Sequence, residues 1–495
     1  MDRSAYAGMN AMGKSRFTRT LLAVCTVLLL GVAIGLRVML MAGKPLWLDE
    51  IFTGAVSQSR IGALLPTWLA ADVHPPLHYL LIDVWTRLFG ASNIALRMPS
   101  LLFSLAVIAV GAWAMGRRHG RDAALLAAVA LAVPAAAVWQ ASEARSYAMQ
   151  MFLALLLMLA HWRVREKWDG KGWLALIGLS ILLCLTHYFG FLFAACIWAV
   201  LLHDGWRARR IGHVVLGGVA TALLLAPWLA WHLPYMLSKT GGNFWIAPLG
   251  FGESLIALIF SMWSDPVYWL LFALLPFSLR IRSQRRLALP AFPFTGYLVS
   301  MLVVAVVLAL VSQRSPLVVP RYMAVFVPMA ALIAVNLYHA MRPGWRLPVM
   351  TAAATAVLAM QFWSPPYGSA GWLAWEDASD WVEARHPDAM LFVLDDPAGR
   401  HIGTANLAKV GGFFLTRSHR TIPVVARTAT EGHPHIDDRL PAGSRVGVIL
   451  VAGRMAGWPK DPALLARLQA RYPRYECRRA ARFDPIACLF ETSRP

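Results

Sequence analysis

The sequence predicts a polytopic α-helical membrane protein that carries a small C-terminal α/β domain. Of its 495 residues, 58% are hydrophobic and 15% are charged, whereas a soluble globular chain is about half apolar and about a quarter charged. Apolar runs of roughly twenty residues, long enough to cross a hydrocarbon core about 30 Å thick, recur along the chain. We expect about eleven spans, near residues 20–41, 97–116, 122–140, 147–162, 173–188, 189–203, 213–232, 265–279, 293–312, 321–341 and 347–364.

The basic residues predict how the spans are oriented. The net charge is +20, and Lys and Arg gather in every second loop, which is the positive-inside pattern. The protein is therefore expected in the bacterial inner (plasma) membrane, with a cytoplasmic N-terminus and, because the number of spans is odd, a periplasmic C-terminal domain. Since the charge follows the topology, it does not indicate a nucleic-acid partner. The first apolar run is interpreted as an anchor.

Composition divides the chain into two domains. Residues 1–367 form the membrane module, and residues 371–495 form the outer α/β domain. In the outer domain, the patterns predict helices over 372–385 and 462–471, strands over 390–394, 421–426 and 445–451, and a hairpin over 475–489. Cys477 and Cys488 flank the turn of this hairpin, and the sequence leaves open whether they form a disulfide. No nucleotide-binding motif is present in this domain.

The first outer loop, about residues 43–96, is long for a connection between spans. Within it, apolar residues recur at helical spacing over 76–89, and Asp83 and Arg87 form an i,i+4 pair on the opposite face. We expect this segment to be a helix in the plane of the membrane interface, where it could form a wall of a surface site.

Two acidic groups in this loop are candidates for chemistry. Asp49 and Glu50 follow the first span, and one carboxylate could act as a general base toward a hydroxyl while the other orients it. The alternative for Asp49 and Glu50 is an ordinary solvated loop pair. Asp72 and His74 precede Pro75-Pro76; they either cap the following helix or position a substrate. No cofactor is certain, but a divalent metal is an alternative use for these four residues.

Cations and aromatic residues at the outer ends of later spans extend the candidate site. Arg145 and Arg321 suit a lipid-linked phosphate, because guanidinium binds phosphate through paired hydrogen bonds. For Arg145, the alternative is a salt bridge to Glu143. Arg37 and Arg97 are interpreted as membrane anchors. The remaining substrate-binding candidates are Tyr147, His187, Tyr188 and Tyr322, and His187-Tyr188 could equally be a packed aromatic pair.

Together these motifs resemble the polytopic glycosyltransferases of the GT-C fold, specifically bacterial relatives of protein O-mannosyltransferases and of lipid A aminoarabinose transferases. The resemblance covers about residues 20–340. It is carried by residues 47–50, 72–79, 95–100, 143–147, 186–188 and 320–322.

The resemblance implies transfer of a sugar from a polyprenyl-phosphate donor, on the periplasmic side and with inversion at the anomeric carbon. It implies Asp49 as the base and Glu50 as its partner, with Asp72 and His74 on the acceptor side or at the donor. Arg145 and Arg321 would stabilise the departing lipid phosphate. The expected partners are membrane lipids, the sugar donor and a cell-envelope acceptor, which is a lipid, a polysaccharide or a protein.

The residues also allow other classes of protein. A lipid or solute transporter or flippase would place ionisable residues near the middle of spans, whereas here they collect at the outer rim. A non-catalytic scaffold would leave the acids and arginines of the outer loop without a role.

Overall fold

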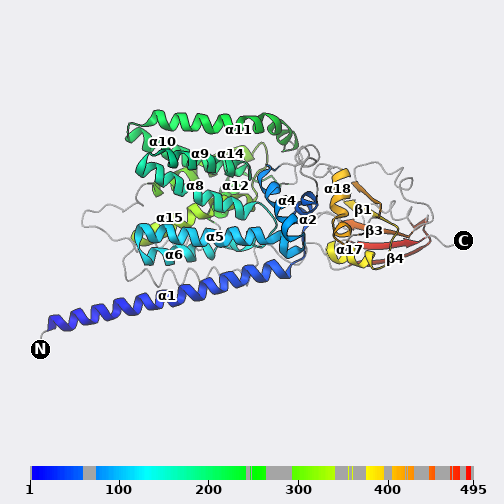
Figure 1. The fold of residues 1–495 in the computed structure, drawn as a ribbon, viewed down its shortest axis with the longest axis horizontal. Coiled ribbons are helices and arrows are strands. Elements are labelled where there is room, and N and C mark those ends of the chain that lie inside the picture. Colours follow the sequence, from blue (N-terminus) through cyan, green and yellow to red (C-terminus); the bar gives the residue numbers. More distant parts are fainter. Residues whose placement is uncertain are drawn as a thin grey trace.

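The computed structural model describes residues 3–58, 74–240, 248–263, 293–340, 375–394, 404–418, 422–428, 445–451, 472–479 and 486–491, together with the isolated positions 246, 355, 359, 420, 469 and 470. Within these ranges, a bundle of long helices stands beside a smaller domain built on a sheet (Figure 1). Both parts of the predicted fold are therefore confirmed.

In the described ranges, six helices are long and apolar enough to cross a membrane. They correspond to six of the expected spans, and their ends differ from the expected ones by eight residues or fewer, except that α1 begins 17 residues before the expected start at residue 20. They are α1 (Arg3–Gly43), α5 (Asn93–His119), α8 (Tyr147–Lys167), α10 (Phe189–Arg207), α11 (Ile211–Thr240) and α14 (Phe294–Ser312).

Shorter helices replace some of the other expected spans. The span expected at 122–140 is two helices, because Pro134 follows the break at Val133 and cannot donate a backbone hydrogen bond. The spans expected at 265–279 and 347–364 lie outside the described residues, apart from two isolated helical positions. The shorter elements are α6 (Arg121–Ala132), α7 (Ala135–Gln140), α9 (Gly170–Cys184), α12 (Phe251–Trp263), the 3₁₀ helix η2 (Pro320–Phe326) and α15 (Val327–Ala340).

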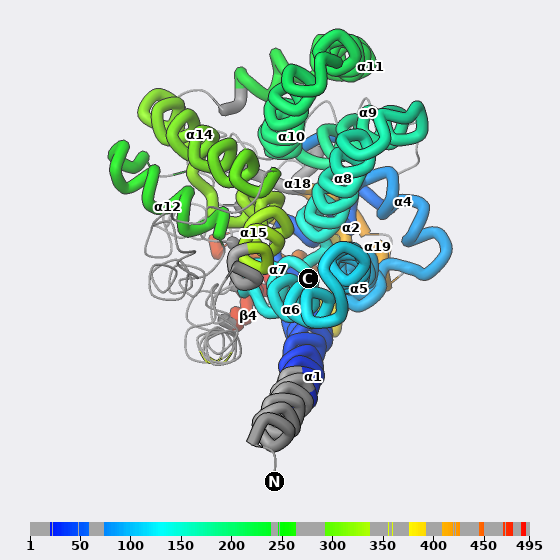
Figure 2. Tube along the Cα trace, turned by 90° about the vertical axis from the view of Figure 1, so that its left-hand side faces the viewer, coloured from blue at the N-terminus to red at the C-terminus, as the bar shows by residue number. Residues whose placement is uncertain are grey.

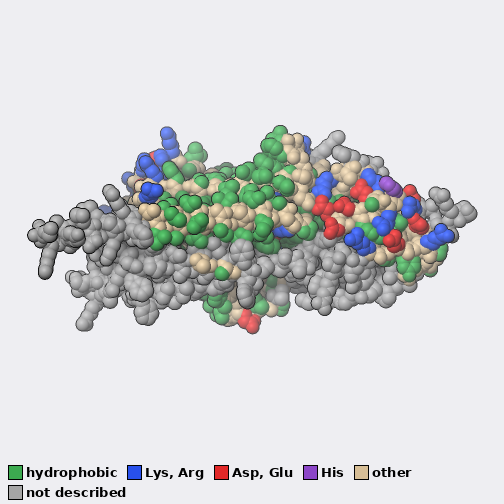
Figure 3. All heavy atoms as spheres, turned by 90° about the horizontal axis from the view of Figure 1, so that it is seen from below, with side chains coloured by type: hydrophobic (Ala, Val, Ile, Leu, Met, Phe, Trp, Pro, Cys, Tyr) green, Lys and Arg blue, Asp and Glu red, His purple; other side chains and the backbone are tan. Residues whose placement is uncertain are grey.

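The surface of the bundle matches a membrane environment. Figure 3 shows a broad apolar band between a basic end on the left and the charged sheet domain on the right. Large apolar side chains on the outer helices are exposed, including Leu174 at 75% and Leu216 at 70%. A soluble protein rarely exposes an apolar surface of this extent, so this band is the surface that contacts lipid.

The two ends of the bundle differ in chemistry. At one end, which we call the basic end, Arg118 at the C-terminus of α5 pairs with Glu166 of α8, and Arg165 of α8 pairs with Asp204 of α10 at 3.2 Å. At the other end, the sheet end, Asn93 at the start of α5 donates to Glu376 of the sheet domain at 2.6 Å. Clusters of Arg and Lys therefore lie at the end away from the sheet domain.

The outer domain is a five-stranded mixed sheet with the order β2-β1-β3-β5-β4. β1 pairs in parallel with both β2 and β3, whereas β5 runs antiparallel to β3 and β4. The predicted strands and hairpin are confirmed, and two helices that the sequence did not indicate, α18 and α19, follow β1. The elements are α17 (Trp375–Glu383), β1 (Ala389–Leu394), α18 (Thr404–Gly411), α19 (Phe413–Arg417), β2 (Val424–Thr428), β3 (Arg445–Val451), β4 (Arg474–Arg479) and β5 (Ile486–Glu491).

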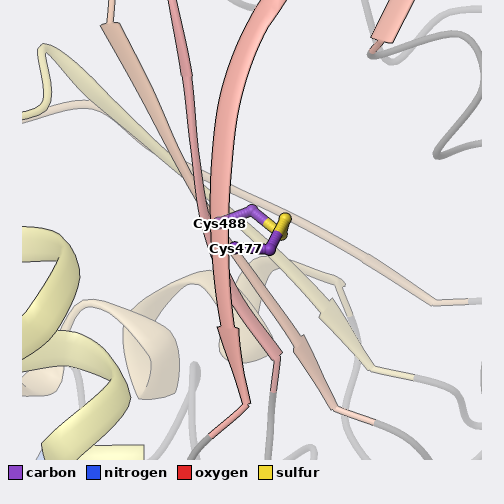
Figure 4. Close-up of a disulfide and its surroundings, with 2 residues drawn as sticks. All are labelled: Cys477 and Cys488. Carbon is purple, nitrogen blue, oxygen red and sulfur yellow. A yellow bond between two sulfur atoms is a disulfide. The ribbon is translucent and has the colours of Figure 1, made fainter.

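A disulfide fastens the edge strand of this sheet. Cys477 on β4 lies directly opposite Cys488 on β5, and the two sulfur atoms are bonded (Figure 4). The predicted hairpin thus brings the two cysteines together and settles the alternative that the sequence left open. Because β4 is the edge strand of the sheet in the described residues, the disulfide adds a covalent link where pairing is weakest.

The sheet domain docks on the first outer loop. Two helices of this loop, α2 (Leu48–Ser57) and α4 (Leu77–Phe89), share one hydrophobic core with α17, α18, α19 and the sheet. α4 confirms the predicted helix, with Arg87 bonded to Asp83 at 2.8 Å. In Figure 2, which views the long helices nearly end-on, α4 runs across the view. The sheet domain therefore holds the loop that carries Asp49 and Glu50.

Candidate active site at the sheet end

The site is organised by the first turn of α2. Asp49 and Glu50 are consecutive in this turn, so their side chains point about 100° apart around the helix. The Asp49 side chain is 30% exposed, whereas that of Glu50 is fully buried. One carboxylate therefore faces an accessible region and the other faces the protein interior.

Glu50 is held in a closed network. Arg97 donates from Nε to Oε1 at 2.7 Å and from Nη2 to Oε2 at 2.6 Å. The backbone amides of Ala144 and Trp47 donate to the same carboxylate. Arg97 also donates to the carbonyl oxygens of one residue in the last turn of α1 and two residues just after it. Those residues are Met41, Lys44 and Pro45. This pair ties α1, α2, α5 and the turn before α8 together.

Arg97 and Arg37 are not the surface anchors expected from the sequence. Both side chains are fully buried. Arg37 donates to Ser104 of α5 and to the backbone of α1, so it joins these two helices. Hydrophobicity alone did not reveal this, because an arginine near a span end has the same sequence pattern whether it faces lipid or protein.

Asp49 faces two arginines from distant parts of the chain. Its Oδ2 lies 3.6 Å from Nη2 of Arg321 and 4.0 Å from Nη2 of Arg145. Arg145 also lies 3.1 Å from Nε2 of His74; because guanidinium has only donors, this imidazole nitrogen accepts and carries no proton. The structure therefore brings together four candidates that are up to 272 residues apart in sequence.

Aromatic rings line the same region. The rings of His187, Tyr147 and Tyr322 contact one another, with centroids 5.1 to 6.3 Å apart, and His187 also contacts His74. Tyr188 departs from this group, because its hydroxyl is bonded to His232 on α11. Thus His187 belongs to the site, whereas Tyr188 packs between α10 and α11.

A second ion pair, Lys44 with Glu143, adjoins the Glu50 network. The sequence indicated Glu143 as a possible partner of Arg145 but did not indicate Lys44. Nζ of Lys44 lies 3.7 Å from Oε1 of Glu143 and 4.1 Å from the ring centroid of Trp139, whose indole donates to the same carboxylate. Glu143 thus pairs with Lys44, and the ion pair of Arg145 is with Asp49. Burial raises the pKa of Glu143, although the charge of Lys44 acts in the opposite direction. Burial likewise lowers the pKa of Lys44, although the charge of Glu143 opposes this shift.

Of the four residues that the sequence offered as an alternative metal set, Asp49, Glu50 and His74 lie among the described residues. Glu50 accepts from Arg97 and two backbone amides, and Nε2 of His74 lies 3.1 Å from the guanidinium of Arg145. Among the described residues, no group of three or more His, Cys, Asp or Glu could hold a metal ion. Asp72 lies outside the described residues.

Comparison with known proteins gives the architecture a family context. Residues 73–231 match the family model described as dolichyl-phosphate-mannose-protein mannosyltransferase. Two crystal structures of ArnT from Cupriavidus metallidurans superpose on nearly the whole chain. The apo structure has a TM-score of 0.58 at 16% identity and covers 94% of this chain and 97% of ArnT.

The chain has the GT-C glycosyltransferase fold. The second structure, ArnT bound to undecaprenyl phosphate, has a TM-score of 0.57 at 14% identity, with 94% of this chain and 97% of that chain covered. No curated protein sequence matches the chain. The family match and the GT-C fold together indicate a glycosyltransferase, as the resemblance implied, and the GT-C bundle carries the arginine-flanked Asp49 at its sheet end.

Proposed function

We propose that this GT-C protein transfers a sugar from a polyprenyl-phosphate donor to a cell-envelope acceptor, which is a lipid, a polysaccharide or a protein, at the periplasmic face of the inner membrane. The observation that carries the proposal is the carboxylate of Asp49, partly exposed between Arg145 and Arg321. Polyprenyl phosphate as the carrier is supported by the ArnT structure that contains undecaprenyl phosphate.

In the proposed reaction, Asp49 accepts the proton of an acceptor hydroxyl. The hydroxyl oxygen forms a bond to the anomeric carbon, the bond from that carbon to the phosphate oxygen breaks, and its electron pair leaves with the lipid phosphate. Direct displacement inverts the anomeric carbon. Arg145 and Arg321 stabilise the negative charge that grows on the phosphate, which lowers the barrier because these cations are already in place.

The other candidates have supporting roles in this proposal. His74 orients Arg145, since its Nε2 accepts from that guanidinium. The rings of Tyr147, His187 and Tyr322 form the wall against which the donor lies. Glu50 is a positioning residue, because its carboxylate is enclosed by Arg97 and backbone amides and has no atom to offer a substrate. Asp72 remains a candidate for the acceptor side.

The orientation of the protein follows from the same assignment. The Arg and Lys clusters of the basic end face the cytoplasm, as the positive-inside rule predicts, and the sheet domain with its disulfide faces the oxidising periplasm. A transporter or flippase is the alternative function. It is disfavoured by the match of residues 73–231 to a mannosyltransferase family.

The test uses membranes from cells with and without the protein, supplied with radiolabelled polyprenyl-phosphate sugars. We expect label to move from lipid to an acceptor only when the protein is present, and Asp49→Asn to slow transfer about 10²–10⁴-fold, the usual contribution of a general base. Asp377→Asn, which removes an exposed carboxylate from α17, is the matched control. Transfer at the normal rate by Asp49→Asn removes this residue as the base, and no transfer from any donor contradicts the function.

A further inference from the structure

The turn between α10 and α11, at the basic end of the bundle (Figure 1), carries three arginines close together. They are Arg207, Arg209 and Arg210, and all three residues are exposed. In the part of the chain that the structure describes, none of the three takes part in an ion pair. Asp204, the acid nearest to them in sequence, is already paired with Arg165. The turn therefore presents three accessible positive charges.

The backbone of this turn holds an arginine where glycine is usual. Arg209 has a φ of 57°, in the left-handed region, and the amide of Arg210 donates to the carbonyl oxygen of Gly205 at 2.7 Å. A helix that ends in this way usually has glycine at the left-handed position, because a Cβ is unfavourable there. The turn between α8 and α9 departs from this pattern too, at Trp168, whose φ is 52°. Bulky residues held in this conformation occur mainly at functional sites.

Arg210 joins these two turns. Its guanidinium carbon lies 5.4 Å from the ring centroid of Trp168, which is within the range of a cation–π contact. The ring carries no net charge, so this contact positions Arg210 and leaves its positive charge available to an anion. Lys171, in the first turn of α9, is also exposed and adds a cation to the second turn.

The cations border the surface that contacts lipid. Trp206 of α10 is 67% exposed, and Ile211 and Leu216 of α11 are exposed as well. Tryptophan at the end of a span is typical of the boundary between hydrocarbon and headgroups. A phospholipid can place its phosphate on the arginines and its acyl chains against α10 and α11, whereas a soluble phosphate compound would leave these apolar side chains in water.

We propose that the α10–α11 turn binds the phosphate of an anionic phospholipid, in the leaflet at the basic end of the bundle. Arg207 and Arg210 donate to the phosphate oxygens, because guanidinium binds phosphate through paired hydrogen bonds, and Trp206 packs at the level of the headgroup. Basic sites between membrane helices are typical of anionic headgroup recognition. A zwitterionic lipid carries a cation that opposes this binding. The site lies at the other end of the bundle from the candidate active site, and the inference is independent of the proposed transferase.

The experiment titrates the purified full-length protein, in neutral detergent micelles, with phosphatidylglycerol or with phosphatidylcholine of the same acyl chains. Bound lipid is counted by native mass spectrometry. We expect phosphatidylglycerol to bind at least about tenfold more tightly, and the difference to shrink as the concentration of ammonium acetate is raised. Equal affinity for the two lipids, or a preference that salt does not reduce, overturns the proposal. Displacement of phosphatidylglycerol by an equal concentration of glycerol phosphate overturns the assignment to a lipid.

Two matched double variants test the location of the site. Arg207→Gln/Arg210→Gln removes two cations from it, whereas Arg117→Gln/Arg121→Gln removes two exposed cations from the α5–α6 turn at the same end. Each cation near an anionic surface contributes roughly a fivefold factor to binding. We therefore expect the first variant to bind phosphatidylglycerol at least about tenfold more weakly, and the second to stay within about twofold of the wild type. Equal losses in the two variants, or no loss in the first, overturn the proposal.

A charge-retaining variant separates the loss of a cation from a defect in folding. Arg207→Lys/Arg210→Lys keeps both positive charges, and lysine also binds phosphate, although as a point charge. We expect this variant to bind phosphatidylglycerol more tightly than Arg207→Gln/Arg210→Gln does. Equal weakening in the lysine and glutamine variants would show that positive charge in this turn does not hold the lipid, and would overturn the proposal.

Discussion

The two neighbouring acids of α2 should respond to substitution in opposite ways. Asp49 is partly exposed beside two arginines, whereas Glu50 and Arg97 form a fully buried pair with two hydrogen bonds of 2.7 and 2.6 Å. Removing one partner of a buried ion pair leaves the other charge unpaired, which destabilises a protein by about 3–5 kcal/mol. Arg97→Met would also leave the carbonyl oxygens of Met41, Lys44 and Pro45 without this donor, so we expect a loss at the upper end of that range.

The assay compares unfolding in mixed micelles with sugar transfer for each variant. We expect Asp49→Asn to lose less stability than Glu50→Gln, because the Asp49 side chain is 30% exposed, but to lose transfer. Glu50→Gln and Arg97→Met should lose stability first and lose transfer in proportion to the unfolded fraction. The double variant should be less destabilised than the sum of the single variants, because it leaves no buried charge. A Glu50→Gln protein that unfolds like the wild type but has no transfer activity would refute the positioning role and make Glu50 a catalytic residue.

Three further predictions follow from other contacts. Burial, with smaller contributions from Arg145 and His74, lowers the pKa of His78 to about 3. Below about pH 6.5 the unfolded chain therefore binds more protons than the folded one, so the free energy of unfolding should fall as the pH drops from 6.5 toward 3. His78→Gln should make the free energy of unfolding depend less on pH in this interval. Cys477→Ser should lower the stability of the sheet domain by about 2–4 kcal/mol and speed proteolysis of the β4–β5 hairpin. Cys184→Ser, which changes a buried free thiol, is the control and should leave hairpin cleavage unchanged. Gly54 of α2 lies against the ring of Phe413, which an added Cβ would meet at 2.6 Å, so Gly54→Val should loosen the sheet domain and increase its cleavage by protease, whereas Gly31→Val, at an open position of α1, should not.

Much of the fold could be predicted because its signals are local. Long apolar runs identify α5, α8 and α14, and alternation with a turn identifies the β4–β5 hairpin. Pro134 ends the span expected at 122–140, but a proline inside an apolar run also occurs within α5, at Pro99, so the sequence does not tell which proline interrupts a span. α18 and α19 were missed because each is no longer than eight residues, too short for periodicity to indicate a helix.

The candidate site was only partly predictable, because partners depend on which side of a helix faces inward. Residue type and position near a span end were sufficient to indicate Asp49, Arg145 and Arg321. The same information placed Arg97 at the lipid surface, whereas it is the buried partner of Glu50. Lys44 gave no signal, since a lysine just after a span is common at membrane surfaces and its pairing with Glu143 requires the turn between α7 and α8.

The shared core of the first outer loop and the sheet domain has a consequence for biogenesis. α2 and α4 are made within the first ninety residues, yet they pack against strands that end at Glu491. During synthesis the turn that carries Asp49 must wait for nearly the whole chain before its apolar face is covered. A chain that stops before the sheet domain would lose the support of its active turn, so early termination should yield an inserted bundle without a working site.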